Sequence, residues 1–99
     1  MVIITETIYP PGSAKDVGKC FVELPSLPDF ITMKGAYIHS SAGQGIRGMV
    51  IYECDKSKLA EAIEIVGDRV TKYFEIPGYT YSMNVWLEAQ EALKLVGLA

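Results

Sequence analysis

Hydrophobic and polar positions along the chain predict four β-strands. Residues 2–9 are rich in β-branched side chains and are followed by the strand-ending run Pro10-Pro11-Gly12. Residues 31–41 and 46–54 are joined by a short glycine-bearing segment, a pattern that favours a β-hairpin. A fourth strand is expected at residues 79–86.

Between the strands, apolar residues recur at the spacing of amphipathic helices. A short helix is predicted after Ser13, a candidate N-cap, and it ends at or before Pro25. Its apolar positions are Ala14, Val17, Phe21 and Leu24. The clearest helix follows the third strand, and its apolar stripe consists of Leu59, Ala62, Ile63, Val66, Val70 and Phe74. Residues 87–96 predict a terminal helix.

The order of these elements is strand, helix, two strands, helix, strand and a final helix. This order is that of the ferredoxin-like βαββαβ motif, an α+β fold in which one four-stranded antiparallel sheet carries both main helices on one face. Ninety-nine residues correspond to one domain, residues 1–99.

The second and third strands predict what lies on the other face of the sheet. If the hairpin closes around residues 43–44, His39 faces Gly48 and Tyr37 faces Val50. One face then carries Met33, Tyr37, His39, Val50, Tyr52 and Cys54. The opposite face carries Ala36, Ile38, Met49 and Ile51, with Lys34 and Glu53 beside them. Because both faces are substantially apolar, the uncovered face is expected to meet another sheet.

Composition narrows the classes of partner. The chain is 49% hydrophobic, which favours a homodimer or higher homo-oligomer. Its net charge is −3 and its lysine and arginine residues are scattered, so nucleic-acid binding is disfavoured. No apolar run approaches the ~20 residues that span a bilayer. The N-terminal segment lacks the pattern of a signal peptide, so a cytoplasmic location is expected.

The segment GQGIRG (43–48) has the G-x-G-x-x-G pattern of dinucleotide-binding loops, and Asp68 lies twenty residues beyond its last glycine. That pattern requires a helix directly after the glycines. Here the residues that follow are typical of a strand. The segment therefore predicts a hairpin tip, with Gly43 and Gly45 serving the turn and Gly48 leaving space beside His39.

Two stretches carry a resemblance to a known superfamily. The segment GQGIRGMVIYECD and the later segment YFEIPGYTY resemble the dimeric α+β barrel superfamily, and more closely one of its small uncharacterised families. The resemblance covers most of the chain. It implies two ferredoxin-like sheets packed face to face, in a superfamily of monooxygenases, haem-degrading relatives, isomerase-like enzymes and ligand-sensing domains. The ligand histidine and tryptophan of the haem-degrading pattern have no match, and no catalytic residue carries over.

Four residues are the candidates for a site. His39 is the only side chain that switches charge near neutral pH without a pKa shift, and it is a candidate proton shuttle. Tyr37 and Tyr52 are candidate ligand-binding residues on the same predicted face. Arg47, predicted on the opposite face, is a candidate anchor for a ligand carboxylate. The alternatives are a hydrogen-bonded histidine at a strand end or dimer rim, and an arginine that pairs across a dimer interface or lies in water.

Metal and cofactor chemistry is not expected. Cys20 and Cys54 are 34 positions apart, and with a single histidine the chain lacks a set of metal ligands at recognised spacing. Both cysteines are interpreted as small buried hydrophobes. Glu53 is expected to form a salt bridge with Lys34 or Arg47.

Three hypotheses of function follow. The first is a small-molecule-binding homo-oligomer whose pocket lies between sheet and helices or at the dimer interface. The second is a cofactor-independent monooxygenase or isomerase that acts on a small aromatic or acidic substrate, with His39 as its catalytic residue. The third is a purely structural oligomer.

Overall fold

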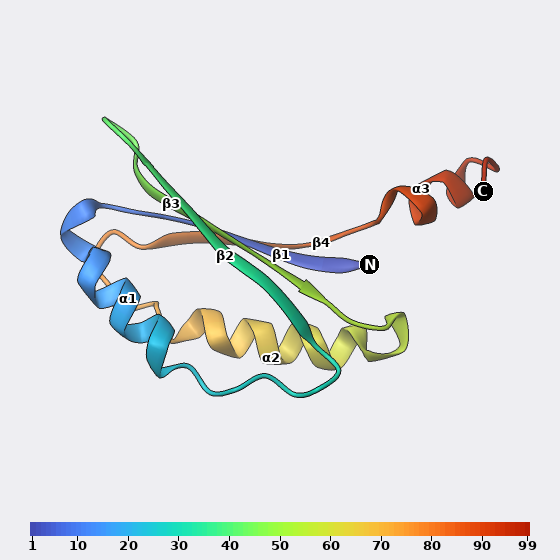
Figure 1. Ribbon diagram of the computed structural model, residues 1–99, viewed down its shortest axis with the longest axis horizontal. Coiled ribbons are helices and arrows are strands. Elements are labelled where there is room, and N and C mark those ends of the chain that lie inside the picture. The colour runs from blue at the N-terminus through green and yellow to red at the C-terminus, as the bar shows by residue number, and fades with distance from the viewer.

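A computed structural model describes residues 1–99. The chain forms four strands and three α-helices (Figure 1). A short 3₁₀ turn precedes each of the first two helices, Pro11–Ser13 before the first and Lys56–Lys58 before the second. The elements in chain order are β1 (Val2–Tyr9), α1 (Ala14–Glu23), β2 (Thr32–Ser41), β3 (Gly45–Glu53), α2 (Leu59–Thr71), β4 (Thr80–Trp86) and α3 (Ala89–Leu95).

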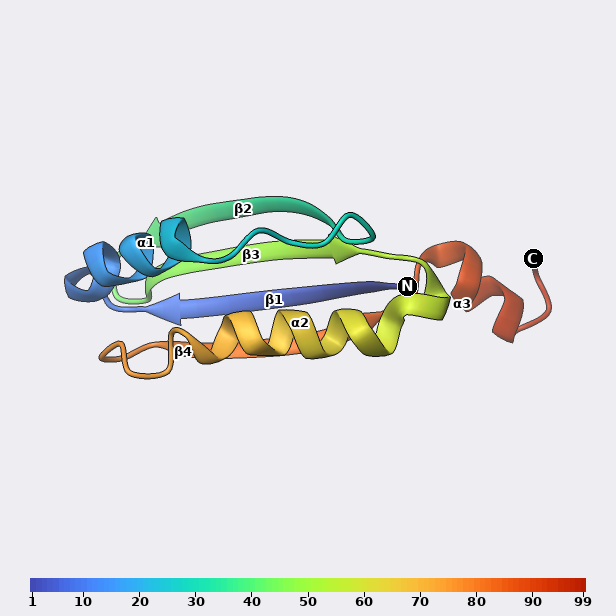
Figure 2. The same cartoon turned by 90° about the horizontal axis from the view of Figure 1, so that it is seen from below.

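All four strands form one antiparallel sheet in the order β2-β3-β1-β4. Both α1 and α2 lie on the same side of this sheet, with α1 along β2 and β3 and α2 along β1 and β4 (Figure 2). The α+β prediction with a four-stranded antiparallel sheet is confirmed, and the arrangement is compatible with a ferredoxin-like fold.

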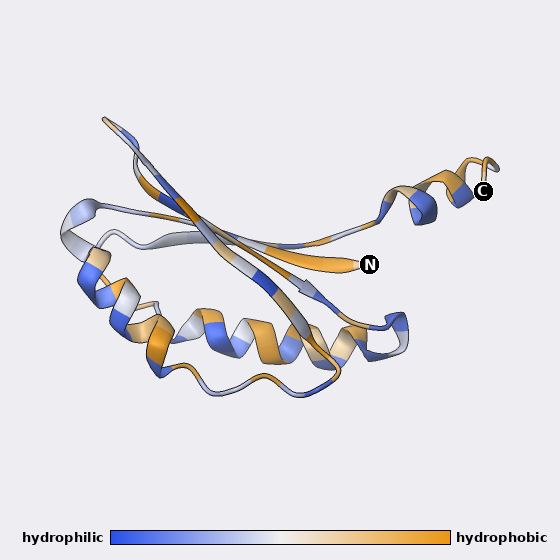
Figure 3. Ribbon diagram, viewed as in Figure 1, coloured by the Kyte–Doolittle hydropathy of each residue, from blue (hydrophilic) through white to orange (hydrophobic).

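The hydrophobic core lies under α2. Ile3 of β1 and Val66 of α2 are fully buried, and Tyr52 and Ile31 complete the cluster with Ala62. Apolar and polar segments alternate along α2 because its inner stripe packs on the sheet while its outer face meets solvent (Figure 3). In contrast, α1 contributes no buried residue.

The register of the β2–β3 hairpin differs from the sequence prediction. His39 lies opposite Arg47 and Tyr37 opposite Met49, because β2 contains an irregularity between Gly35 and Tyr37. Gly35 has a φ of +103°, a conformation that glycine adopts without strain. One extra residue in a strand reverses the face of every residue beyond it. The prediction that Tyr37 and His39 share a face with Tyr52 was therefore wrong.

The sheet face that points away from α1 and α2 has no second layer. We call it the free face. Two of its large side chains are half-exposed, Tyr37 at 55% and Trp86 at 50%. By the strand register, the residues of the free face are Val2, Ile4, Glu6, Ile8, Thr32, Lys34, Tyr37, His39, Ser41, Gly45, Arg47, Met49, Ile51, Glu53, Thr80, Ser82, Asn84 and Trp86.

Helix α3 extends beyond the end of β4, on the side of the sheet away from α1 and α2 (Figure 1). Its side chain Glu91 accepts a hydrogen bond from the Met1 amino group at 2.6 Å. Three apolar side chains at its end are exposed, Leu95, Val96 and Leu98. None of the helices combines the length and the apolar character that crossing a membrane requires.

Candidate functional site

A cavity of about 410 Å³ lies between α1 and the sheet. Thirteen of its nineteen lining residues are hydrophobic, so the cavity has an apolar wall with a few polar groups. Four elements and one connection contribute most of the lining: Thr5, Thr7 and Tyr9 of β1, Val17, Gly18 and Phe21 of α1, Gly48, Val50 and Tyr52 of β3, Arg69 and Val70 of α2, and Tyr73 and Tyr79 between α2 and β4.

The cavity exists because α1 presents apolar side chains to the sheet without packing tightly on it. Phe21 remains 38% exposed. A β-carbon at Gly18 would meet no other atom within 4 Å, although this position lines the cavity. On the opposite wall, a β-carbon at Gly48 would lie 2.9 Å from the Thr7 hydroxyl oxygen. Glycine at this second position therefore keeps the floor of the cavity open.

Three tyrosines form an aromatic end of the cavity near the start of α1. The rings of Tyr73 and Tyr79 stack with centroids 4.9 Å apart, and Tyr9 stacks on Tyr79 at 6.4 Å. Burial raises the pKa of both Tyr73 and Tyr79 far above the ordinary tyrosine value. Their hydroxyl groups therefore stay neutral and can donate or accept a hydrogen bond.

The connection between α2 and β4 holds this aromatic end in place. The Ser13 hydroxyl donates a hydrogen bond to the Pro77 carbonyl oxygen at 2.5 Å. Ser13 does not cap α1 with its side chain, which corrects the sequence prediction. Gly78 packs directly against Pro10, so that any β-carbon there would lie 2.6 Å from the proline ring.

The other end of the cavity contains a buried cation, Arg69. Arg69 as a whole is only 9% exposed to solvent. Nη1 donates a hydrogen bond to the Pro25 carbonyl oxygen at 2.8 Å, and Nη2 lies 3.9 Å from the Met33 sulfur. The guanidinium lies 6.0 Å from the centre of the Tyr52 ring. Nε has no hydrogen-bond partner, and no carboxylate forms a salt bridge with Arg69.

Arg69 was not among the residues predicted from sequence, although its position indicates an unusual environment. It lies seven residues after Ala62 and three after Val66, so it falls on the inner face of α2 together with them. An arginine at a buried position of an amphipathic helix is uncommon, because charged side chains are rarely buried unless they are paired. This mismatch between residue type and position is the feature that points to the site.

The four residues predicted from sequence do not gather in the cavity. Tyr52 is buried and lines it. Tyr37, His39 and Arg47 lie together on the free face and are exposed, with His39 directly across from Arg47. The predicted separation of Arg47 from His39 on opposite faces was wrong, since the β2 irregularity brings them to one face. Gly48 lies opposite Ile38 rather than beside His39.

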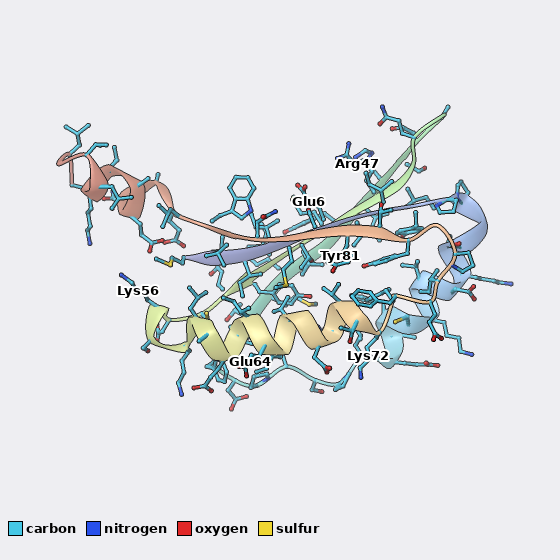
Figure 4. The ribbon with its side chains drawn as sticks, turned by 180° about the vertical axis from the view of Figure 1, so that it is seen from behind. Glu6, Arg47, Lys56, Glu64, Lys72 and Tyr81 are labelled. Atoms are coloured by element: carbon cyan, nitrogen blue, oxygen red, sulfur yellow. The ribbon has the colours of Figure 1, made fainter.

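Charged side chains on the free face fall into two groups. Lys34 and Glu53 form the predicted salt bridge at 2.7 Å. Glu6 and Arg47 have no salt-bridge partner and point away from the helices (Figure 4).

The two cysteines are free and half-buried. Cys20 lies on α1, where its thiol is 3.5 Å from the Lys72 carbonyl oxygen. Burial, reinforced by the nearby Glu23, raises the pKa of the Cys20 thiol. The structure contains no cluster of three or more histidine, cysteine, aspartate or glutamate side chains that could hold a metal ion.

The structure is that of a small α+β protein with an apolar cavity, which has polar groups at its two ends. No family model matches the chain, and no curated protein matches it. Among solved structures, the chain is similar to part of a tripeptidase from Staphylococcus aureus, with 16% sequence identity and a TM-score of 0.44. The match covers 99% of this chain and 35% of the peptidase. A likeness at this level says nothing about activity.

Proposed function

We propose that the protein binds a small apolar molecule in the cavity between α1 and the sheet. The observation that carries this proposal is the cavity itself, whose volume of about 410 Å³ lies within the range of pockets that enclose small-molecule ligands. Its apolar wall and its few polar groups are the usual composition of such pockets.

A ligand in this position completes the packing of the domain. Protein interiors are packed as densely as organic crystals, and voids larger than a water molecule are few. In this chain the void lies under a whole helix, since α1 buries none of its residues. A bound apolar molecule would cover Val17 and Phe21 from the inside and shield Val50 and Val70 from water.

Methyl-group NMR tests the location of binding with a neutral probe, 4-phenyl-1-butanol. We expect the methyl signals of Val17, Val50 and Val70 to shift on titration, because these side chains line three walls of the cavity. The methyl signals of Val96 and Leu98 are the internal control, since they lie at the exposed end of the chain. The proposal fails if the cavity methyl groups do not respond, or if all five signals shift alike.

We further propose that the chain forms a homodimer through its free face, in the arrangement of a dimeric α+β barrel. Four apolar side chains surround Glu6 on this face: Ile4 and Ile8 flank it along β1, and Met49 and Ile51 lie on the neighbouring strand. Antiparallel sheets with one wet face normally alternate apolar and polar positions. Four strands of about eight residues give a flat sheet area of roughly 500 Å², to which the projecting side chains add further surface. With the exposed apolar end of α3 beside it, this approaches the ~800 Å² per partner typical of stable interfaces.

The unpaired charges of the free face support a two-fold arrangement. In a symmetric dimer every contact occurs twice. If one residue of the first chain touches a different residue of the second chain, the same two positions also touch with the chains exchanged. Glu6 and Arg47 are opposite charges on neighbouring strands of one face, and neither is paired within the chain. A second copy packed face to face would pair each glutamate with the other chain's arginine, and each arginine with the other chain's glutamate.

Charge reversal tests this interface. We expect Glu6→Arg to weaken the dimer at least tenfold, because the substituted cation would meet an arginine in a desolvated interface. Adding Arg47→Glu to the same chain is expected to restore dimerisation. Glu64→Arg is the matched control, since Glu64 lies exposed on α2, on the other side of the sheet (Figure 4). Sedimentation that gives a monomer for the unaltered chain would contradict the proposal.

Catalysis is not part of the proposal. His39 is exposed and does not line the cavity, so no observed geometry brings it to a molecule bound there. In the proposed dimer, Arg47 pairs with Glu6 of the other chain, and Tyr37 lies on the face that the second copy covers.

A further inference from the structure

We infer that the ligand is an elongated apolar monocarboxylate whose carboxylate is held by Arg69. This inference rests on the proposed binding function and gives the chemical class of the ligand. The observation behind it is a cation that lines the cavity, is buried to nine-tenths and has no counter-ion in the chain.

An anion stabilises a buried guanidinium more than additional neutral contacts do. Removing a charge from water is costly unless it is paired and hydrogen-bonded. The groups around Arg69 are a backbone carbonyl, a thioether and an aromatic ring, all of them neutral. The adjacent acid Asp68 points outward and pairs with Lys72 at 3.9 Å, so it does not supply the missing charge.

The ligand's orientation follows from the two ends of the cavity. Arg69 is bonded to Pro25, two residues after α1 ends, whereas the tyrosine cluster lies beside Tyr9, just before α1 begins. Ten residues of α-helix span about 15 Å, which separates the Pro25 end of α1 from Tyr9, while Tyr73, four residues after Arg69, is the member of the tyrosine cluster nearest the cation. The ligand's carboxylate therefore belongs at Arg69, and its apolar or aromatic body lies along α1 toward the tyrosines.

The same geometry argues for a single negative charge. Tyr73 and Tyr79 are neutral because burial raises the pKa of each, and no lysine, histidine or second arginine lines the cavity. A second anionic group at the aromatic end would be buried without a partner. A planar carboxylate also matches the two-donor fork of a guanidinium.

Calorimetric titration with a matched pair of probes tests this inference. The pair is 4-phenylbutyrate and 4-phenyl-1-butanol, which differ mainly in charge at one end. We expect the unaltered protein to bind the carboxylate about ten- to a hundredfold more tightly, the range for hydrogen bonds to charged groups. Arg69→Gln retains an amide donor for the Pro25 carbonyl but lacks the charge. We expect it to lose this preference while its affinity for the alcohol is unchanged.

A control variant accompanies this test, and a measurement on the unaltered protein keeps the inference falsifiable if Arg69→Gln does not fold. Lys56→Gln removes an exposed cation that does not line the cavity; it is the control and is expected to keep the preference. In the unaltered protein, affinity for the acid probe is expected to fall as the pH falls through the probe's own carboxyl pKa, while affinity for the alcohol stays constant. Equal affinity for both probes, or no such pH dependence, overturns the role of Arg69 and leaves cavity binding in place. Failure of both probes to bind contradicts the proposed function itself.

Discussion

A large side chain at Gly18 is expected to raise the stability of the fold and to lower the affinity of the cavity for a ligand. Gly18 lies within α1 and lines the cavity, and a β-carbon there would meet nothing within 4 Å. In Gly18→Phe the ring would occupy the space that we assign to the ligand. Burying a phenylalanine side chain stabilises a protein by about 1.5–3 kcal/mol, and replacing a glycine inside a helix adds about 0.5 kcal/mol. We therefore expect a gain of roughly 2 kcal/mol, and for a domain of this size a melting temperature higher by about 8–16 °C.

Thermal denaturation and calorimetric titration with 4-phenyl-1-butanol measure the two effects on the same samples. We expect Gly18→Phe to melt at a higher temperature and to bind the probe at least tenfold more weakly. Gly18→Ala is the matched control, since it gains about 0.5–1 kcal/mol from helix propensity while leaving the cavity open. It is expected to bind like the unaltered protein. Unchanged probe affinity in Gly18→Phe would refute the reasoning, because a filled cavity cannot hold the probe.

Two other predictions concern the aromatic end. Gly78→Ala is expected to lower the free energy of unfolding by about 1–3 kcal/mol, because φ is +73° at Gly78 and the new methyl would lie 2.6 Å from the Pro10 ring; a denaturant titration that shows no change would contradict the described packing. The raised pKa of Tyr73 and Tyr79 means that their contribution to stability is complete below the ordinary tyrosine pKa of 10.0 and is lost as the pH rises through their folded-state values. Tyrosinate absorbance should therefore contain a component that appears together with alkaline unfolding, and complete ionisation of all tyrosines in the folded protein would argue against their burial.

Periodicity alone was sufficient to predict the elements of this fold. The strand predicted at residues 2–9 is β1 without change, β2 and β4 each begin one residue later than predicted, and β3 begins and ends one residue earlier. The stripe of α2 was predicted because Ala62 and Val66 recur at helical spacing on its buried face. These features are local, so a short window of sequence contains them.

The candidate site could not be predicted in the same way, because it depends on how segments far apart in the sequence pack together. The irregularity at Gly35 moves Tyr37 and His39 to the other face, and its place in the strand depends on pairing with β3. The cavity depends on how far α1 stands from the sheet, which the apolar pattern of α1 does not specify. Arg69 could have been found from the sequence, but its significance required the observation that no acid forms a salt bridge with it.

Native mass spectrometry of the protein purified from its source cells tests the central claim most directly, because it reports chains and retained molecules together. The account predicts a species of two chains that carries added mass, which denaturation releases as a small apolar carboxylic acid. A spectrum that contains only the bare single chain would contradict the account, since it would show neither the partner for the free face nor an occupant for the cavity.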